Sequence, residues 1–182
     1  MFKKVNILDE KEKILHEISD EVEGKLSDKE IDLIKRSLKQ LRFSQIEELS
    51  LKYNLRPGMG LAFPQLGIKK RVIMICHEEK PGKFNDYVVI NPKIVSNSTE
   101  MIAADAGEGC LSVNREVEGH VPRFARVTIE GYDIEGNKIR IRAREELAIA
   151  FQHEIDHLNG ILFYERIDKN KPFYTESEMR LI

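Results

Sequence analysis

The chain has 182 residues, of which 41% are hydrophobic and 33% charged, a composition typical of a soluble globular protein with a sizeable core. The formal net charge is −2, and the basic residues are scattered, so neither a DNA-binding protein nor another general polyanion binder is expected. The charged N-terminal residues argue against a signal peptide, and the lack of a long apolar run argues against a membrane span. The length predicts one domain over residues 1–182. Two cysteines do not make a disulfide framework, so we expect a cytoplasmic protein whose thiols stay reduced.

The first predicted element is a long N-terminal helix that begins at a capping box, Ser27-Asp28-Lys29-Glu30. Its apolar residues recur at helical spacing: Ile31, Ile34, Leu38 and Leu41. The helical character continues to about Tyr53, and the proline and glycine of Leu55–Gly58 then end the helix. We expect this helix to be scaffold without chemistry, followed by a Gly- and Pro-rich loop to Gly67.

Several later segments are rich in β-branched residues or alternate apolar with polar residues, which predicts strands: 71–76, 87–90, one or two within 93–104, 125–132 and 138–143. The last two flank turn residues 133–137 and therefore predict a β-hairpin. A second helix is predicted over 144–158, and 161–164 can form a short strand. This order predicts an α+β fold with mostly antiparallel β-sheets around the second helix.

The strongest chemical signal is Gln152-His153-Glu154-Ile155-Asp156-His157, within the second helix. Residues four apart share one face of a helix, so His153 and His157 can direct two imidazoles at one metal ion. Glu154 lies beside them and can contact water on that ion, as in H-E-x-x-H metallohydrolases. Such a pair can also lie on a solvated surface, but the apolar residues before it indicate burial, and buried polar groups need partners.

A catalytic metal site of this kind needs a third protein ligand, and Cys110 is the best candidate. It lies in Gly107-Glu108-Gly109-Cys110-Leu111-Ser112, where glycines allow the backbone to approach other groups closely. Taken alone, Cys110 is equally compatible with a small buried hydrophobe. Cys76 follows apolar strand residues and is expected in the core. The other histidines lack partners at ligand spacing: His16, His77 and His120.

A third segment, Gly58-Met59-Gly60-Leu61-Ala62-Phe63-Pro64-Gln65, matches neither a dinucleotide fingerprint nor a P-loop. The three segments together resemble the peptide deformylase family, whose signature is a G-x-G-φ-A-A-x-Q loop, an E-G-C-φ-S strand and a Q-H-E-x-D-H helix, in that order. The spacing, the hairpin, the total length and Leu158-Asn159-Gly160 look like the longer class found in Gram-positive bacteria and their relatives.

The chain departs from the family pattern at Phe63, where the second alanine of the first motif is usual. This large increase in volume requires that the flank repacks or that Phe63 turns outward. The placement of Gln65, two residues later, depends on the outcome. The proline that the family has between Asp9 and Leu15 is also missing.

The resemblance implies hydrolysis of the N-formyl group from the N-terminal formyl-methionine of nascent polypeptides, which releases formate. It implies one divalent metal ion, Fe²⁺ as the native ion with Zn²⁺, Ni²⁺ or Co²⁺ as alternatives, held by Cys110, His153 and His157. Glu154 then acts as general base, and the Gln65 side chain and the Leu111 backbone N–H stabilise the oxyanion. The expected substrate-binding residues surround these groups: Met59, Gly60, Gly109, Ile149 and Ala150.

Two alternatives remain open from the sequence. A peptidase or amidase built on the same helix would cleave internal peptide bonds and leave formyl-methionyl peptides intact. A non-catalytic module that binds a ribosome or another protein would hold a structural metal with four protein ligands. The expected partners are formyl-methionyl nascent peptides, with transient ribosome contact, and neither DNA nor a membrane.

Overall fold

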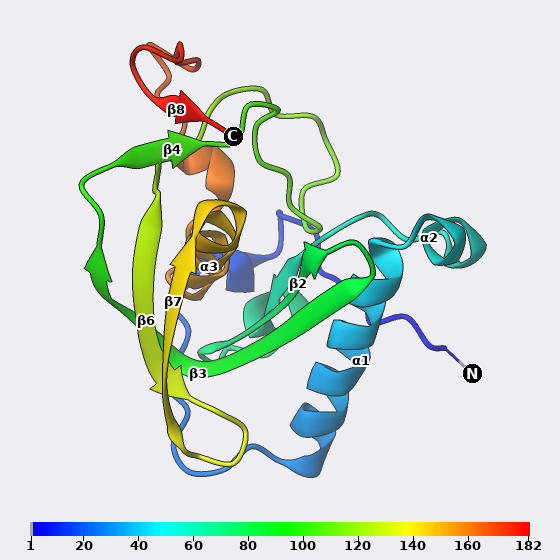
Figure 1. Ribbon diagram of the computed structural model, residues 1–182. Coiled ribbons are helices and arrows are strands. Elements are labelled where there is room, and N and C mark those ends of the chain that lie inside the picture. Colours follow the sequence, from blue (N-terminus) through cyan, green and yellow to red (C-terminus); the bar gives the residue numbers. More distant parts are fainter. Residues whose placement is uncertain (1) are drawn as a thin grey trace.

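The computed structural model describes residues 2–182 as two sheets arranged around one central helix, α3 (Glu145–Leu158) (Figure 1). The larger sheet has the strand order β1-β2-β3-β6-β7: β1 (Gly60–Ala62), β2 (Val72–Lys80), β3 (Lys83–Asn97), β6 (Arg126–Tyr132) and β7 (Lys138–Arg144). The smaller sheet has the order β5-β4-β8: β5 (Arg123–Phe124), β4 (Met101–Ala103) and β8 (Arg180–Leu181). Among the strands of the described residues, only β4 and β8 pair in parallel, which confirms the predicted α+β class with mostly antiparallel sheets. No helix within residues 2–182 is apolar over a length that would span a bilayer.

The predicted N-terminal helix is shorter than expected. Helix α1 (Asp28–Ser44) begins at the capping box, where the Ser27 hydroxyl accepts from the Glu30 N–H and the Glu30 carboxylate accepts from the Ser27 N–H. Helical character continues to Tyr53 as expected, but in a separate helix, α2 (Glu47–Tyr53), which follows a break after Ser44. The Ser44 hydroxyl donates to the Leu41 carbonyl and accepts from the Gly58 N–H, which fastens the end of α1 to the following loop. A short 3₁₀ helix, η1 (Lys13–His16), precedes α1.

The strands follow the sequence patterns with several corrections, among them that β1 lies within the segment predicted as a loop to Gly67. Strand β3 is one long strand because Pro92 lies at a bulge, where no ladder N–H is required. The expected strand at 161–164 is instead a 3₁₀ helix, η3 (Phe163–Arg166), and Glu108–Ser112 lies in a loop outside the strands. The predicted β6–β7 hairpin is confirmed, and the Asp133 carboxylate accepts the backbone N–H groups of Glu135 and Asn137 in its turn.

Phe63 turns inward, away from the central helix. It opens a 3₁₀ helix, η2 (Phe63–Leu66), directly after β1 and is fully buried. Successive residues of a strand point to opposite faces, so Ala62 packs in the cluster that contains Phe151 of α3, whereas Phe63 packs with Leu61 in the core beneath α1. Of the two alternatives, the flank repacks around Phe63 and Phe63 does not turn outward. The face of β1 that lies toward α3 keeps the small Ala62.

We expect Phe63→Ala, which restores the usual residue of the resembled family, to destabilise this chain. The substitution leaves a cavity among large apolar side chains, and such changes cost about 3–5 kcal/mol. The free energy of unfolding, measured by urea titration, should fall by this amount. A loss below about 1 kcal/mol would show that the core beneath α1 collapses around the smaller side chain.

Candidate metal centre

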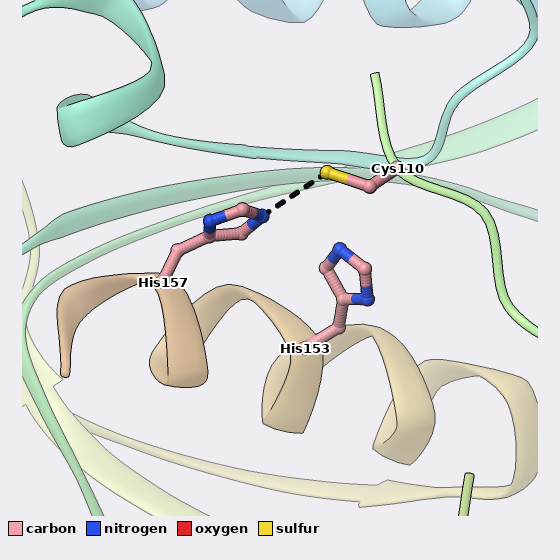
Figure 2. Close-up of side chains that lie close together, drawn as sticks. All are labelled: Cys110, His153 and His157. Carbon is pink, nitrogen blue, oxygen red and sulfur yellow. Dashed lines mark hydrogen bonds between the residues drawn. The ribbon is translucent and has the colours of Figure 1, made fainter. Parts of the chain in front are cut away.

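Three side chains from two separate segments meet at one point. His153 and His157 lie one turn apart on α3, and Cys110 comes from the loop that precedes β5 (Figure 2). The ligand atoms of the three residues all lie within 4.8 Å of one another, and Cys110 Sγ is 3.2 Å from His157 Nε2. Cys110 and His157 are buried, so the histidine pair does not lie on a solvated surface. Cys110 contacts His157 and is therefore not simply a small apolar core residue.

The remaining candidate ligands lie elsewhere. Cys76 is buried in β2, as expected for a core residue. His77 lies near Glu146 at the surface, and His120 is buried and hydrogen-bonded to backbone groups of Asp105 and Tyr174. The cluster of potential metal ligands in the described chain therefore consists of Cys110, His153 and His157.

A chain of buried charges holds His153 in place. His153 Nδ1 is 2.8 Å from Glu108 Oε2, so this bond leaves Nε2 as the free nitrogen of the His153 ring. Arg123 donates two hydrogen bonds to Glu108, at 2.7 and 3.0 Å, and a third to Asp156, at 2.6 Å. Asp156 also accepts two hydrogen bonds from Arg166. Burial acts to raise the pKa of Glu108, but the hydrogen bonds from His153 and Arg123 outweigh it and leave the pKa at about 2.

The sequence pattern did not identify the supporting residues Arg123 and Arg166. Glu108 and Asp156 lie inside the two chemical motifs, but nothing in the sequence joined them, because they are 48 residues apart in the numbering of the chain. Arg123 lies outside all three motifs. The one signal in the sequence was a charged side chain beside apolar residues, which can indicate a buried ion pair. Such outer contacts orient the ligands and fix which ring nitrogen faces the metal.

Glu154 has the environment expected of a proton carrier. Its side chain is buried, and Oε2 has no hydrogen-bond partner in the described part of the chain. Burial raises the pKa of Glu154 to about 7. A Cβ atom on Gly60 would lie 2.3 Å from Glu154 Oε1, so only glycine at this position leaves the carboxylate in place.

Gln65 presents its amide nitrogen to the same point. Its Oε1 accepts from the Ala62 N–H at 2.8 Å, which fixes the amide plane. Its Nε2 then donates to Ser112 Oγ at 3.1 Å and faces Cys110 Sγ at 3.5 Å. Arg56, which the sequence analysis missed, donates to the backbone carbonyls of Cys110 and Val113 and so braces the loop that carries the thiol.

A cavity of about 730 Å³ opens onto this cluster. Its wall contains every predicted site residue except His157: Met59, Gly60, Gln65, Gly109, Cys110, Leu111, Ile149, Ala150, His153 and Glu154. Arg56, Glu145, Glu146 and Ile182 also line the cavity, and the sequence had not singled them out.

The donor set fits a divalent transition metal. A thiol and two imidazoles are ligands that such ions prefer, and burial lowers the pKa of His157, which favours the neutral imidazole that can bind a metal. The three ligands come with a cavity on one side rather than a fourth protein ligand, which is the arrangement of catalytic rather than structural sites. The fold and the site thus define a metallohydrolase of the H-E-x-x-H type.

Comparison with known proteins gives the family. Residues 4–173 match the polypeptide deformylase family. Peptide deformylase 2 of Bacillus subtilis strain 168 is 46% identical over 168 residues, which cover 92% of this chain and 91% of that protein. The peptide deformylase of Oceanobacillus iheyensis is 48% identical over 152 residues, which cover 84% of this chain and 83% of the relative. The chain belongs to the peptide deformylase family, metal-dependent hydrolases that remove the N-formyl group from nascent polypeptides.

Solved structures agree with this assignment. The Met-Ala-Ser-bound class I type b peptide deformylase from Acinetobacter baumannii is similar with a TM-score of 0.72 and 32% identity, over 92% of this chain and 100% of that chain. A plant peptide deformylase gives a TM-score of 0.75 and 27% identity, over 93% of this chain and 84% of that chain. The predicted resemblance to relatives from Gram-positive bacteria is also confirmed.

Proposed function

We propose that Cys110, His153 and His157 hold one divalent ion, with Fe²⁺ as the native ion, and that Glu154 is the general base of deformylation. The observation that carries this proposal is the buried carboxylate of Glu154 next to the ligand cluster, whose Oε2 has no hydrogen-bond partner among residues 2–182. A bound ion supplies a Lewis acid that lowers the pKa of a coordinated water. The thiolate and imidazole donors suit Fe²⁺ and also accept Zn²⁺, Ni²⁺ or Co²⁺.

The protein side chains move the proton and stabilise the developing charge. Glu154 accepts a proton from the attacking water and returns it to the leaving amine. The Gln65 amide and the Leu111 backbone N–H donate to the oxyanion that forms at the formyl oxygen. Loss of one such donor typically lowers the rate about 10²- to 10³-fold.

The cavity supports recognition of formyl-methionyl peptides. The formyl group carries only a hydrogen beyond its carbonyl carbon, and we expect the part of the cavity near Gly60 and Leu111 to reject a larger acyl group. Ile149 and Ala150, one turn before the ligands, and Met59 form the apolar surface for the methionine side chain. Backbone groups near Gly60 and Gly109 can pair with the peptide as an added strand, which favours little sequence preference beyond methionine.

The cellular setting follows from this substrate. We infer that the protein acts in the cytoplasm, where new chains emerge and thiols stay reduced. Transient ribosome contact is part of the proposal, because the substrate is a nascent chain. The 182 residues are proposed to act as one catalytic domain.

The proposed function is tested by formate release from formyl-Met-Ala-Ser, using purified protein loaded with Fe²⁺ or Ni²⁺. Formate should appear in equal amount to free N-terminal methionine, and acetyl-Met-Ala-Ser should remain intact. Cleavage between Met and Ala, with the formyl group retained, would favour a peptidase. A folded, metal-loaded protein that releases no formate would contradict the proposal.

A further inference from the structure

Strand β8 leads directly into the wall of the catalytic cavity, although it is far from the chemical motifs in the sequence. It pairs in parallel with β4, with Ile102 opposite Arg180 and Ala103 opposite Leu181 (Figure 1). The next residue, Ile182, lines the cavity together with Met59, Ile149, Cys110 and His153. The sequence analysis assigned no role to this segment.

Two backbone hydrogen bonds hold Ile182 next to Ala104. The Ile182 N–H donates to the Ala103 carbonyl at 3.0 Å, and the Asp105 N–H donates to the Ile182 carbonyl at 2.9 Å. Ala104 also lines the cavity and packs in the same apolar cluster as Ile149. Ile149, Ala104 and Ile182 therefore supply apolar lining to the same cavity, with Ala104 next to both of the others.

An ion pair joins β8 to the beginning of α3. Arg180 donates to both carboxylate oxygens of Glu145, at 2.7 and 2.8 Å, and its third nitrogen donates to Glu100 at 2.9 Å. Glu145 has a left-handed φ of 56°, which is uncommon outside glycine and persists only where surrounding contacts hold the backbone. The pair is half-exposed and adds little stability by itself, but its two-point geometry restricts where β8 can lie.

We propose that Ile182 is a specificity-determining residue that forms the outer part of the pocket for the substrate's methionine side chain, and that Arg180 positions it through Glu145. This inference rests on the proposed function, because it assigns one residue to the substrate pocket of the same site. A methionine side chain is long and unbranched, and when its backbone lies near the metal ligands it extends past Ile149 toward Ile182. Short side chains end before they reach Ile182.

The first test compares Ile182→Ala with the wild type on formyl-Met-Ala-Ser and formyl-Ala-Ala-Ser. Loss of the apolar contact should raise KM about fivefold for the methionine substrate, leave kcat within about twofold, and leave the alanine substrate unchanged. Val95→Ala is the matched control, because Val95 is 45% exposed and Ile182 39%, and Val95 lies on β3 outside the cavity. An unchanged ratio of kcat/KM between the two substrates in Ile182→Ala would overturn the proposal.

A binding measurement separates this inference from the proposed function. Calorimetric titration with the product Met-Ala-Ser needs no turnover, and Ile182→Ala should weaken its Kd about fivefold relative to Ala-Ala-Ser. If the wild type releases no formate, the deformylase proposal fails whatever the titration shows. If the wild type is active and both peptides bind Ile182→Ala as they bind the wild type, only the role of Ile182 fails.

The second test concerns the positioning role of Arg180. Arg180→Met should raise KM for formyl-Met-Ala-Ser several-fold without changing kcat, and Arg180→Lys should restore part of the effect because it keeps one charged contact. Arg126→Met is the matched control, since Arg126 donates to the same Glu100 but does not contact Glu145. Equal KM values for Arg180→Met and Arg126→Met would contradict the positioning role.

Discussion

Replacing Glu154 with glutamine is expected to lower kcat for formate release by about 10²- to 10⁴-fold while the metal stays bound. Glutamine has nearly the same shape as glutamate, so the buried space beside Gly60 stays filled. It cannot accept the proton of the attacking water, and the other carboxylate next to the ligands, Glu108, is already hydrogen-bonded to His153 and Arg123. The loss should therefore appear in kcat and not in metal content.

The measurement is steady-state release of formate from formyl-Met-Ala-Ser, with the metal content of each sample determined by mass spectrometry. Glu48→Gln, an exposed carboxylate on α2, is the matched control and should behave like the wild type. If Glu154→Gln kept full metal and near wild-type kcat, the base would have to be another group. Loss of metal together with activity would instead indicate that Glu154 shapes the ligand cluster.

Replacing Arg123 with methionine is expected to cost about 3–5 kcal/mol of folding free energy, because it leaves two buried carboxylates without their shared cation. Arg123 is 2% exposed, and its partners Glu108 and Asp156 are 4% and 6% exposed. For a chain of this size, such a loss corresponds to a fall in Tm of about 10 °C. Metal affinity should also fall about tenfold, because Glu108 orients His153.

Thermal unfolding and a competitive chelator titration measure the two effects. Arg126→Met is the control here as well, because its ion pair with Glu100 is largely exposed, with side chains 57% and 38% accessible, and should contribute less than about 1 kcal/mol. A Tm for Arg123→Met within about 2 °C of the wild type would mean that the carboxylates become protonated or rearrange at little cost. Unchanged metal affinity would show that His153 keeps its orientation without Arg123.

Local sequence signals were sufficient wherever neighbouring residues decide the structure. The capping box at Ser27, the turn at Asp133 and the helical spacing of His153 and His157 all rest on contacts within a few residues, and the structure has them as predicted. The signals were less reliable at element ends. The break at Ser44 depends on a hydrogen bond to Gly58, and continuity of β3 through Pro92 depends on pairing with β6.

The sequence by itself determined the metal-ligand types, the central helix and the resemblance to a family. Each depends on a short motif, in which the residue types and their spacing along the chain are enough to indicate the chemistry or the helix. Only the tertiary structure decided that Phe63 enters the core beneath α1, that Arg123 joins Glu108 to Asp156, and that Ile182 reaches the catalytic cavity. These contacts join residues that are distant in the chain. Apolar side chains come together because leaving water is favourable, and charges that become buried with them need partners.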